Sequence, residues 1–414
     1  MRHALIINHN AGSPYHGPNF RSYYAALGWV RNGLKATIVC SSFSHKLKNL
    51  PQVVDDYLVE VIDGIRYIWI KTSPFSSNVG RLINYIKFHR RLNLLCDIIK
   101  EPVDYVICSS PPPFWIWFSR RLALSKGALL IFEARDLWPD VIFETTRLGL
   151  INPAAWWMKA AETAAYRYAD SVVSVNKSAI KIMQNRGLSP SRFCAIPNGV
   201  TIDIEGQHEV KSESVILCNS LRKDGLFVVG YAGALSMVYG LAYLAKAAEL
   251  LQNEKIAFVL AGTGEYEIEL RKMERKLPNF HLAGWVPKVQ LHGFLKSVDI
   301  CFAGLLNIKS FAFGSDSTKI YEYMKASKPV LHAIGNEESI VVRAKCGVRI
   351  APEDSISIVN GIRDLSSRSP EELGAMGRSG MDFLRSNRGY DILTNKWLQL
   401  FKTLDERKHD QPQI

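Results

Sequence analysis

The chain has 414 residues, of which 47% are hydrophobic and 22% are charged, as in an ordinary folded globular protein. One hydrophobic core rarely serves a chain of this length, so two domains of about 200 residues each are expected. The formal net charge of +12 predicts an anionic partner. No zinc-finger spacing, RNA-binding motif or Lys/Arg tract accompanies this charge, so nucleic acid is not the expected partner.

The seven cysteines are scattered without CxxC or Cys/His clusters, which argues against a disulfide framework or a structural zinc site and favours a reducing compartment. The first ten residues, MRHALIINHN, become polar too early for a secretory signal. No apolar run approaches the roughly 18 residues that cross a bilayer. We therefore expect a cytoplasmic protein without a membrane-spanning segment.

Short, continuously apolar runs alternate with longer helix-period segments, a pattern typical of buried parallel strands joined by helices. In the first half the predicted strands are ALIINHN (4–10), KATIVCS (35–41), DYVICSS (104–110), ALLIFEA (128–134) and SVVSVN (171–176). The segment YLVEVIDGIRYIWIK (57–71) predicts a hairpin that turns at Asp63 and Gly64.

The series begins again after DIEGQHEVKSES (203–214), a polar stretch without periodicity that suits a linker. The later predicted strands are LFVVGYAG (226–233), IAFVLAG (256–262), NFHLAGWV (279–286), VDICFAG (298–304) and KPVLHA (328–333). Two such series predict an α/β protein with two doubly wound, Rossmann-like domains. An amphipathic helix is expected over residues 391–406.

Glycine-led turns follow four of the strands predicted for the second half. Doubly wound sheets bind ligands beyond the carboxyl ends of their strands, and glycine lets the backbone approach a ligand there. The turns are GALS (233–236), GTGE (262–265), GWVPK (284–288) and GSDSTK (314–319).

The stretch FGSDSTKIYEYMKASKPVL (313–331) places a hydroxyl-rich loop before a short helical run. Backbone N–H groups at the helix start, together with Lys319, would bind an anion. Glu322 shares the face of Lys319, and a phosphate would repel it unless it bound a neutral group such as the paired hydroxyls of a ribose. The pattern predicts a nucleoside diphosphate site; a capped helix with a solvated Lys319–Glu322 pair is the alternative.

Five motifs follow one another along the chain: FEARDLWPDV (132–141), AIPNGV (195–200), VLAGTGE (259–265), HLAGWVP (281–287) and GSDSTKIYEYMKASKPVL (314–331). In order and spacing they resemble glycosyltransferase family 4 of the two-domain GT-B fold, especially its bacterial surface-polysaccharide members. The resemblance implies an acceptor-binding domain over residues 1–203 and a nucleotide-sugar-binding domain over residues 204–386, facing a central cleft. A helix over residues 387–414 would pack back toward the first domain.

The resemblance also implies which positions bind the donor. Glu322 matches the carboxylate that holds the ribose, and Val286 matches the position whose backbone contacts the base. The other donor-binding positions are the glycines and loop residues Gly17, Gly233, Gly262, Gly264, Asp316, Ser317, Thr318 and Lys319.

The chain departs from the family pattern at three places. The first of two family carboxylates falls on Gly314, and Asp316 would have to replace it. Ala234 and Tyr239 stand where many relatives carry Arg and Lys, and Arg135 stands at the place of a family histidine. The cations left to meet the diphosphate are Lys319, Arg135, Arg21 and Lys288.

The implied reaction is retaining transfer of a hexosyl or N-acetylhexosaminyl group from a UDP- or GDP-linked donor, which is a co-substrate rather than a resident cofactor. No carboxylate is placed as a nucleophile, so front-face attack is preferred, in which the leaving phosphate accepts the acceptor's proton. The catalytic candidates are Arg135, Asp136, Lys319 and Glu322. Glu133 or Asp136 would orient Arg135 or act as general base, unless either merely caps a strand. No DxD or His-rich cluster indicates a metal.

Three aromatic or cationic segments bear on the acceptor: GRLINYIKFHRRLNLL (80–95), PPPFWIWFSRR (111–121) and NPAAWWMKAA (152–161). Together they would seat the first domain on an anionic membrane surface, where a polyprenyl-diphosphate-linked glycan of an O-antigen or capsule would be the acceptor. The alternative is that these aromatics belong to the core.

Two other functions fit the same pattern. A sugar-nucleotide epimerase of GT-B fold would convert the donor without a transfer product. A non-catalytic relative would bind nucleotide without turnover, as the missing carboxylate and cations allow. A Rossmann dehydrogenase does not fit, because Glu267 stands where a GxGxxG motif needs its third glycine.

Overall fold

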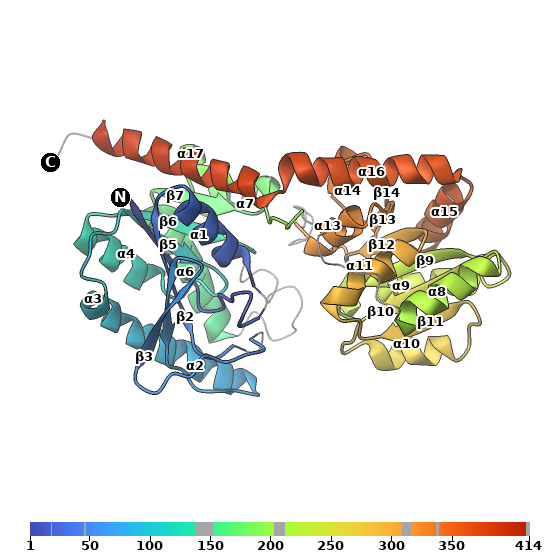
Figure 1. Ribbon diagram of the computed structural model, residues 1–414, viewed down its shortest axis with the longest axis horizontal. Helices are drawn as coiled ribbons and strands as arrows, with labels where there is room; N and C mark the ends of the chain where they lie inside the picture. Colours follow the sequence, from blue (N-terminus) through green and yellow to red (C-terminus); the bar gives the residue numbers. More distant parts are fainter. Residues whose placement is uncertain are drawn as a thin grey trace. The chain divides into compact units, whose positions relative to one another are not determined.

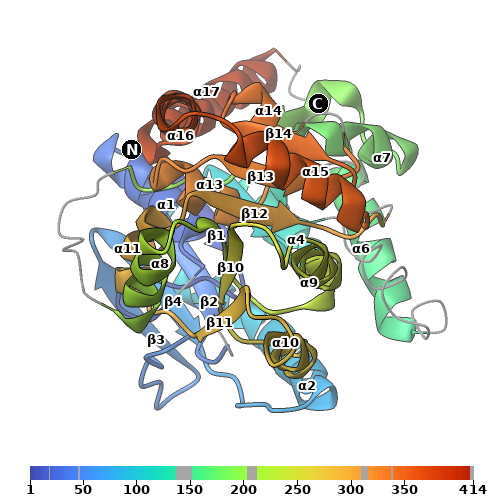
Figure 2. The ribbon, with the colours of Figure 1, turned by 90° about the vertical axis from the view of Figure 1, so that its right-hand side faces the viewer.

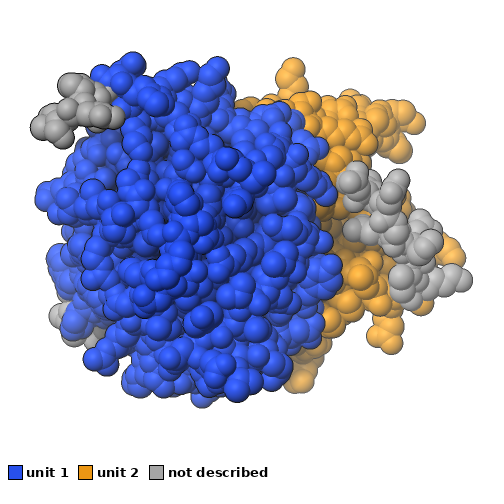
Figure 3. Space-filling model, turned by 60° about the vertical axis from the view of Figure 1, so that its left-hand side comes forward, with its two compact units in different colours: residues 1–199, 390–414 blue, residues 200–389 orange. Residues whose placement is uncertain are grey.

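The computed structural model (Figure 1) describes residues 1–17, 19–44, 47–136, 152–202, 212–308, 316–336 and 339–410. The chain forms two compact units, coloured in Figure 3: Met1–Gly199 with Tyr390–Ile414, and Val200–Gly389. The sequence placed the two boundaries at 203/204 and 386/387. Most of the predicted linker, residues 203–211, lies outside the described residues.

The first unit contains an eight-stranded sheet in the order β3-β4-β2-β1-β5-β6-β7-β8. Neighbouring strands are parallel except in the β3–β4 hairpin, whose turn places Asp63 and Gly64 at positive φ, as predicted. The predicted strands of this unit are confirmed, and β8 is an addition. The strands are β1 (His3–Ile7), β2 (Lys35–Ser41), β3 (Tyr57–Ile62), β4 (Ile65–Ile70), β5 (Tyr105–Ser109), β6 (Leu129–Ala134), β7 (Ser171–Ser174) and β8 (Phe193–Ala195).

Helices cover both faces of this sheet. Side chains of β1 alternate between two apolar layers, with Leu5 and Ile7 in one and Ala4 and Ile6 in the other. Helices α2, α3, α4, α6 and α7 build the first layer, and α1 and α17 build the second. The helices are α1 (Arg21–Arg31), α2 (Asn78–Arg91), α3 (Leu95–Ile98), α4 (Ile116–Lys126), α6 (Pro153–Tyr168), α7 (Ile180–Asn185) and α17 (Tyr390–His409).

The terminal helix α17 packs against α1 of the first unit, which begins more than 350 residues earlier in the chain (Figure 1). Trp397 contacts Trp29 edge to face, with ring centroids 5.3 Å apart, and Phe401 stacks on Tyr105 at 4.1 Å. Gly28 allows the close approach of the two helices, because a Cβ there would overlap the side chain of Thr394.

The second unit contains a six-stranded, wholly parallel sheet in the order β11-β10-β9-β12-β13-β14. Its five predicted strands are confirmed, and β14 is an addition at the edge. The strands are β9 (Phe227–Ala232), β10 (Ile256–Ala261), β11 (Phe280–Gly284), β12 (Ile300–Gly304), β13 (Val330–Ala333) and β14 (Gly347–Ile350).

Helices α9, α10 and α15 line one face of this second sheet and α8, α11, α13 and α14 line the other (Figure 2). The helices are α8 (Glu213–Lys223), α9 (Leu241–Leu250), α10 (Glu267–Glu274), α11 (Lys288–Ser297), α13 (Thr318–Lys325), α14 (Ile340–Arg343), α15 (Ser355–Ser366) and α16 (Pro370–Asn387). Each unit is thus a doubly wound α/β domain, as the sequence predicted. Within the described ranges, every helix is too short or too polar to span a membrane.

Candidate active site

A cavity of 390 Å³ lies at the carboxyl ends of β9, β10 and β11, beside the start of α13. Such ends are where doubly wound sheets hold their ligands. Six of the residues that the sequence singled out for the donor line this cavity. They are Gly233, Gly262, Val286, Thr318, Lys319 and Glu322.

Glycines let the turns after β9 and β10 touch. Gly262 has φ +150°, and a Cβ at this position would overlap the carbonyl oxygen of Gly233. A Cβ at Gly264, which does not itself line the cavity, would overlap the carbonyl oxygen of Leu235. Both positions therefore exclude every side chain, and the cavity floor is backbone.

Helix α13 presents its first turn to the cavity. Its N-cap Ser317 makes no side-chain hydrogen bond to the first turn, which leaves backbone N–H groups for an anion. Ile320 and Met324 on the opposite face are buried in the core. Tyr323 fixes the helix to the end of β9, since its hydroxyl accepts from the Ala232 amide at 3.0 Å and lies 3.1 Å from the Ala232 carbonyl oxygen.

Lys319 and Glu322 are the two charged side chains among the described residues that line the cavity. The Lys319 ammonium donates to the hydroxyl of Tyr231 at 2.6 Å. Burial lowers the pKa of Lys319 to about 7. Glu322 is half-buried, and its carboxylate lies 3.9 Å from the ammonium of Lys288, which is 71% exposed.

The rim of the cavity contains a residue that the sequence interpretation did not name. Trp285 precedes Val286 in the turn after β11 and is 64% exposed, although it lines the cavity. Tryptophan side chains are highly buried on average, so one with this exposure at the rim of a cavity does not belong to the hydrophobic core. Trp285 is part of the GWVP motif, but the resemblance implies a ligand contact only for the backbone of Val286.

Asp316 does not line the cavity. The Tyr321 hydroxyl donates to its carboxylate, and the guanidinium of Arg388 lies 3.8 Å from the same oxygen. Arg388 also donates to the Tyr321 hydroxyl at 2.7 Å. Asp316 therefore belongs to a buried cluster beside α13. Gly314 and the rest of residues 309–315 lie outside the described residues.

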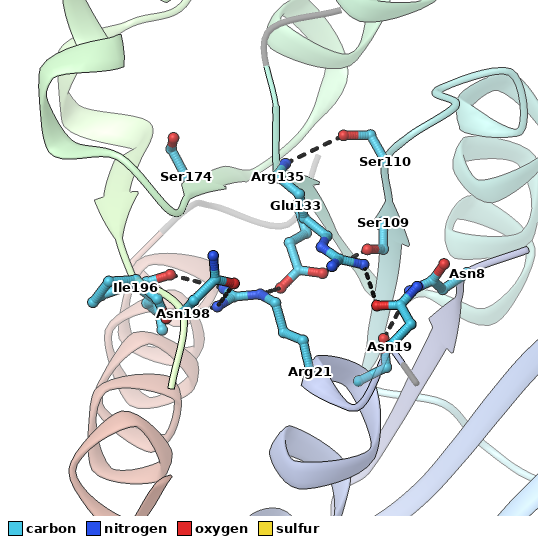
Figure 4. A network of polar contacts seen from close by, with 12 residues as sticks. Asn8, Asn19, Arg21, Ser109, Ser110, Glu133, Arg135, Ser174, Ile196 and Asn198 are labelled. Atoms are coloured by element: carbon cyan, nitrogen blue, oxygen red, sulfur yellow. Dashed lines mark hydrogen bonds and ion pairs between the residues drawn. The ribbon is translucent and has the colours of Figure 1, made fainter. Parts of the chain in front are cut away.

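A second polar group occupies the carboxyl ends of β5 and β6 in the first unit (Figure 4). Arg21 donates to Glu133 at 2.8 Å, and Ser109 donates to the other carboxylate oxygen at 2.6 Å. Burial alone would raise the pKa of Glu133, but the charges of Arg21 and Arg135 outweigh it and lower that pKa. Glu133 is thus held as an anion.

Arg135 fixes the N-terminal loop that contains Gly17. Its guanidinium donates to the side-chain oxygen of Asn19 at 2.7 Å (Figure 4). The Asn19 side-chain amide donates in turn to the backbone oxygen of Asn10 at 2.6 Å. Gly17 itself has φ +126° and pairs with Ser13 in an isolated bridge. Asp136 is exposed, and most of the DLWPDV stretch after it lies outside the described residues.

The catalytic and donor-binding candidates from the sequence thus fall into three groups. Six line the cavity, whereas Gly264, Asp316 and Ser317 stand near it without lining it. Gly17, Arg135 and Asp136 belong to the first unit. The described residues hold no group of three or more His, Cys, Asp or Glu side chains arranged for a metal ion.

Two family models match the chain in succession. The model described as "Glycosyl transferase 4-like domain" matches residues 16–199, and the one described as "Glycosyl transferases group 1" matches residues 227–368. The chain is 22% identical over 282 residues to the probable glycosyltransferase WbjE of Pseudomonas aeruginosa, which covers 67% of this chain and 69% of that protein.

Solved structures share the fold over almost the whole chain. Sucrose-phosphate synthase from Thermosynechococcus elongatus has a TM-score of 0.73 at 14% identity, covering 98% of this chain and 100% of that one. Anabaena HepE in complex with UDP-glucose has a TM-score of 0.66 at 15% identity, covering 97% and 100%. Together with the two family models, these likenesses show that the chain belongs to the group 1, or family 4, nucleotide-sugar-dependent glycosyltransferases and has the GT-B fold.

Proposed function

We propose that this protein transfers a hexosyl or N-acetylhexosaminyl group, with retention, from a UDP- or GDP-sugar to a growing or lipid-linked bacterial surface polysaccharide. The observation that carries the proposal is the cavity of 390 Å³ in the second unit. It combines a backbone floor, an uncapped helix start, one ammonium and one carboxylate. These are the groups that a pyrophosphate and a ribose need.

Each part of the donor has a partner in this assignment. The amides at the start of α13 and the Lys319 ammonium bind the pyrophosphate, and Glu322 accepts hydrogen bonds from the two ribose hydroxyls. The backbone of Val286 contacts the base. HepE, which shares the fold, has been solved with UDP-glucose, in agreement with a nucleotide-sugar as donor.

The chemistry follows from where the negative charge develops. As the bond between the anomeric carbon and the phosphate oxygen breaks, the leaving diphosphate gains charge, which Lys319 and the helix amides stabilise. The acceptor hydroxyl attacks from the same face, and its proton passes to the leaving phosphate oxygen. Arg135 and Asp136, at the end of β6, are proposed to serve the acceptor.

The surface of helix α2 supports an acceptor that is presented at a membrane. Val79, Leu82, Ile83 and Ile86 have the spacing of a helical stripe, yet they are 69%, 36%, 47% and 41% exposed. The core-facing side of α2 is supplied instead by Asn84 and Phe88. An exposed apolar stripe on a helix that also carries Arg81, Lys87, Arg90 and Arg91 suits an anionic membrane surface.

The other two segments contribute less to such a surface. Phe114, Trp115 and Phe118 are core residues, as the alternative interpretation held, whereas Trp117, Trp156 and Trp157 are 37%, 50% and 38% exposed. We propose peripheral attachment to the inner face of the cytoplasmic membrane through α2, where a polyprenyl-diphosphate-linked glycan would be presented.

The test is a donor panel with a transfer readout. Labelled UDP- and GDP-sugars are incubated with the protein and with vesicles that contain polyprenyl-diphosphate-linked glycans, and lipid-linked product is separated from donor. We expect one donor to give a longer glycan with the anomeric configuration retained. Interconversion of the donor without transfer would indicate an epimerase, and binding without turnover would indicate a non-catalytic relative.

A further inference from the structure

The turn after β9 supplies no cation to the cavity: Ala234 lines it, and Tyr239 follows in the 3₁₀ turn η5 (Met237–Tyr239). The negative charge of a pyrophosphate must therefore be met by other groups. Among the described lining residues the single cation is Lys319, which comes from α13 on the other side of the cavity. The surroundings of this ammonium therefore decide how the donor is held.

Two tyrosines enclose the Lys319 ammonium. Its nitrogen lies 3.0 Å from the ring centroid of Tyr239, in the 3₁₀ turn η5 (Met237–Tyr239), and 4.6 Å from that of Tyr231. The Tyr231 hydroxyl accepts from the ammonium at 2.6 Å and donates in turn to the Ala234 carbonyl oxygen at 2.6 Å. The ring face of Tyr239 and the hydroxyl of Tyr231 thus hold the Lys319 ammonium in a fixed position.

The stem of Lys319 is confined as well. A Cβ at Gly233 would overlap the Lys319 Cε atom, so the lysine methylenes cross directly over the glycine at the end of β9. A side chain at position 233 would displace the lysine from this path, and the φ of +151° separately favours glycine there. The ammonium cannot swing to solvent without losing both aromatic contacts.

Among the residues that the structure describes, the titratable groups around Lys319 are tyrosines and one carboxylate that is paired elsewhere. From β9 and η5 the neighbours are the hydroxyls of Tyr231 and Tyr239, and Tyr323 on α13 is bonded to Ala232. Glu322, also on α13, has Lys288 of α11 as its ion-pair partner. Burial lowers the pKa of Lys319 to about 7, so near neutral pH this amine loses its proton far more readily than an exposed lysine does.

We propose that Tyr231 and Tyr239 are positioning residues that hold Lys319 as the cation for the pyrophosphate, and that donor binding is coupled to uptake of one proton by this lysine. The inference rests on the proposed donor site. A pyrophosphate beside the amine favours its charged form, so the bound state holds the proton more tightly than the empty state. By linkage, affinity for the donor must fall as pH rises above 7.

Proton uptake can be counted directly. UDP-glucose and GDP-mannose are suitable probes because their pyrophosphate is a diester that does not titrate near neutral pH. Titration calorimetry in buffers of different ionisation enthalpy, between pH 6.5 and 8.5, gives the number of protons bound per ligand. We expect uptake to approach one proton at pH 8.5 and affinity to fall about tenfold per pH unit above the pKa of Lys319.

Variants separate positioning from simple structural support. Lys319→Arg keeps its charge at every pH, so uptake should vanish and affinity should become independent of pH. Tyr231→Phe removes the hydroxyl that accepts from the ammonium, which should move the pH dependence to lower pH and raise KM. Tyr239→Leu removes the ring face and should likewise move the pH dependence to lower pH and raise KM, and Tyr239→Phe, which keeps the ring, should shift the pH dependence less than Tyr239→Leu. Tyr243→Phe on α9, outside the cavity, is the matched control.

Different results would overturn the proton coupling, the positioning role and the proposed function. If a nucleotide-sugar binds without proton uptake and with the same affinity at pH 7 and 8.5, the coupling is overturned while the donor site stands. If Tyr231→Phe and Tyr239→Leu leave the pH profile unchanged, the positioning role is overturned. If neither probe nor any other UDP- or GDP-sugar binds, the proposed function itself fails.

Discussion

Arg21 and Glu133 form an ion pair of 2.8 Å in which both side chains are almost completely buried, with exposures of 8% and 5%. The same guanidinium donates to the backbone oxygens of Ile196 and Pro197 at 2.7 and 2.6 Å. Arg21 thus fastens the segment after β8 to the end of β6. Its role in this structure is to hold the first unit together around a carboxylate.

Breaking this pair should be costly. Arg21→Met or Glu133→Leu leaves one buried charge without its partner and should lower the free energy of unfolding by roughly 3–5 kcal/mol. The double variant should lose less than the sum of the two single losses, because neither member of this pair remains buried without the other. Urea unfolding of the four proteins measures the coupling. Arg363→Ala, in the exposed pair with Glu254, is the control and should cost far less, because solvent screens this pair. Equal losses for the buried and exposed pairs would contradict the assignment.

Glu322 should be needed for the sugar part of the nucleotide rather than for its phosphates. Hydrogen bonds to a charged acceptor are worth about 1.5–3 kcal/mol, so Glu322→Gln should reduce kcat/KM about 10- to 150-fold. A 2′-deoxy donor should suffer a similar loss with the wild type and little further loss with the variant. Steady-state kinetics with both donors checks this. Glu269→Gln, on the exposed side of α10, serves as control. Additive losses would show that Glu322 acts elsewhere.

The glycine floor should tolerate no methyl group. Gly262→Ala and Gly264→Ala would force a Cβ into a carbonyl oxygen of the neighbouring turn, so we expect loss of nucleotide-sugar binding together with a lower unfolding temperature. Gly293→Ala, within α11, is the matched control, since its Cβ would meet only Val215 at 3.7 Å. It should leave binding intact and stabilise the helix slightly. Binding by Gly262→Ala at wild-type affinity would exclude a close backbone approach to the ligand.

Lys319 should also make stability depend on pH. Its folded-state pKa of about 7 lies below the ordinary value of 10.5, so between these values the unfolded chain binds more protons than the folded one. Stability from this group therefore rises with pH through that window. The wild type should gain stability relative to Lys319→Met when urea unfolding is moved from pH 6.5 to pH 8. If the free energy of unfolding changes equally with pH in the two proteins, the amine is not desolvated.

Membrane attachment through α2 should depend on its exposed stripe. Ile83→Glu should reduce co-sedimentation with anionic vesicles at low salt without changing the unfolding temperature, because the side chain is 47% exposed. Release of the wild type by high salt would show that its cationic side chains contribute to vesicle binding. Ile356→Glu on α15, whose side chain is 57% exposed, is the control and should sediment like wild type. If the wild type does not sediment, this part of the proposal fails.

Hydrophobic patterning predicted most of the fold, for a physical reason. Central parallel strands are buried on both faces, so β1, β5 and β10 read as unbroken apolar runs. The edge strands β8 and β14 have half-buried residues and only three or four positions, so their pattern is too weak to distinguish from a turn. The aspartate–glycine turn of the β3–β4 hairpin, in contrast, has a strong local signal.

Site residues that belong to a local backbone motif could be predicted from the sequence. Contacts between side chains of different helices and strands could not. Gly262 and Glu322 follow from motif positions, and both line the cavity. The Tyr231–Tyr239 seat joins a strand, a turn and a helix, and Tyr231 reads in sequence as an ordinary buried strand residue. The cluster of Asp316, Tyr321 and Arg388 spans more than 70 residues, and no spacing rule connects its members.

Helix α17 gives the first unit a core that is discontinuous in sequence, since Trp397 and Phe401 pack on side chains of α1 and β5. During synthesis the ribosome releases residues 200–389, which form their own hydrophobic clusters, before it releases this helix. The second unit can therefore fold on the nascent chain while Trp29 and Tyr105 still await their covering. A premature stop after residue 389 would leave a folded second unit attached to a first unit that lacks part of its core and is prone to aggregate.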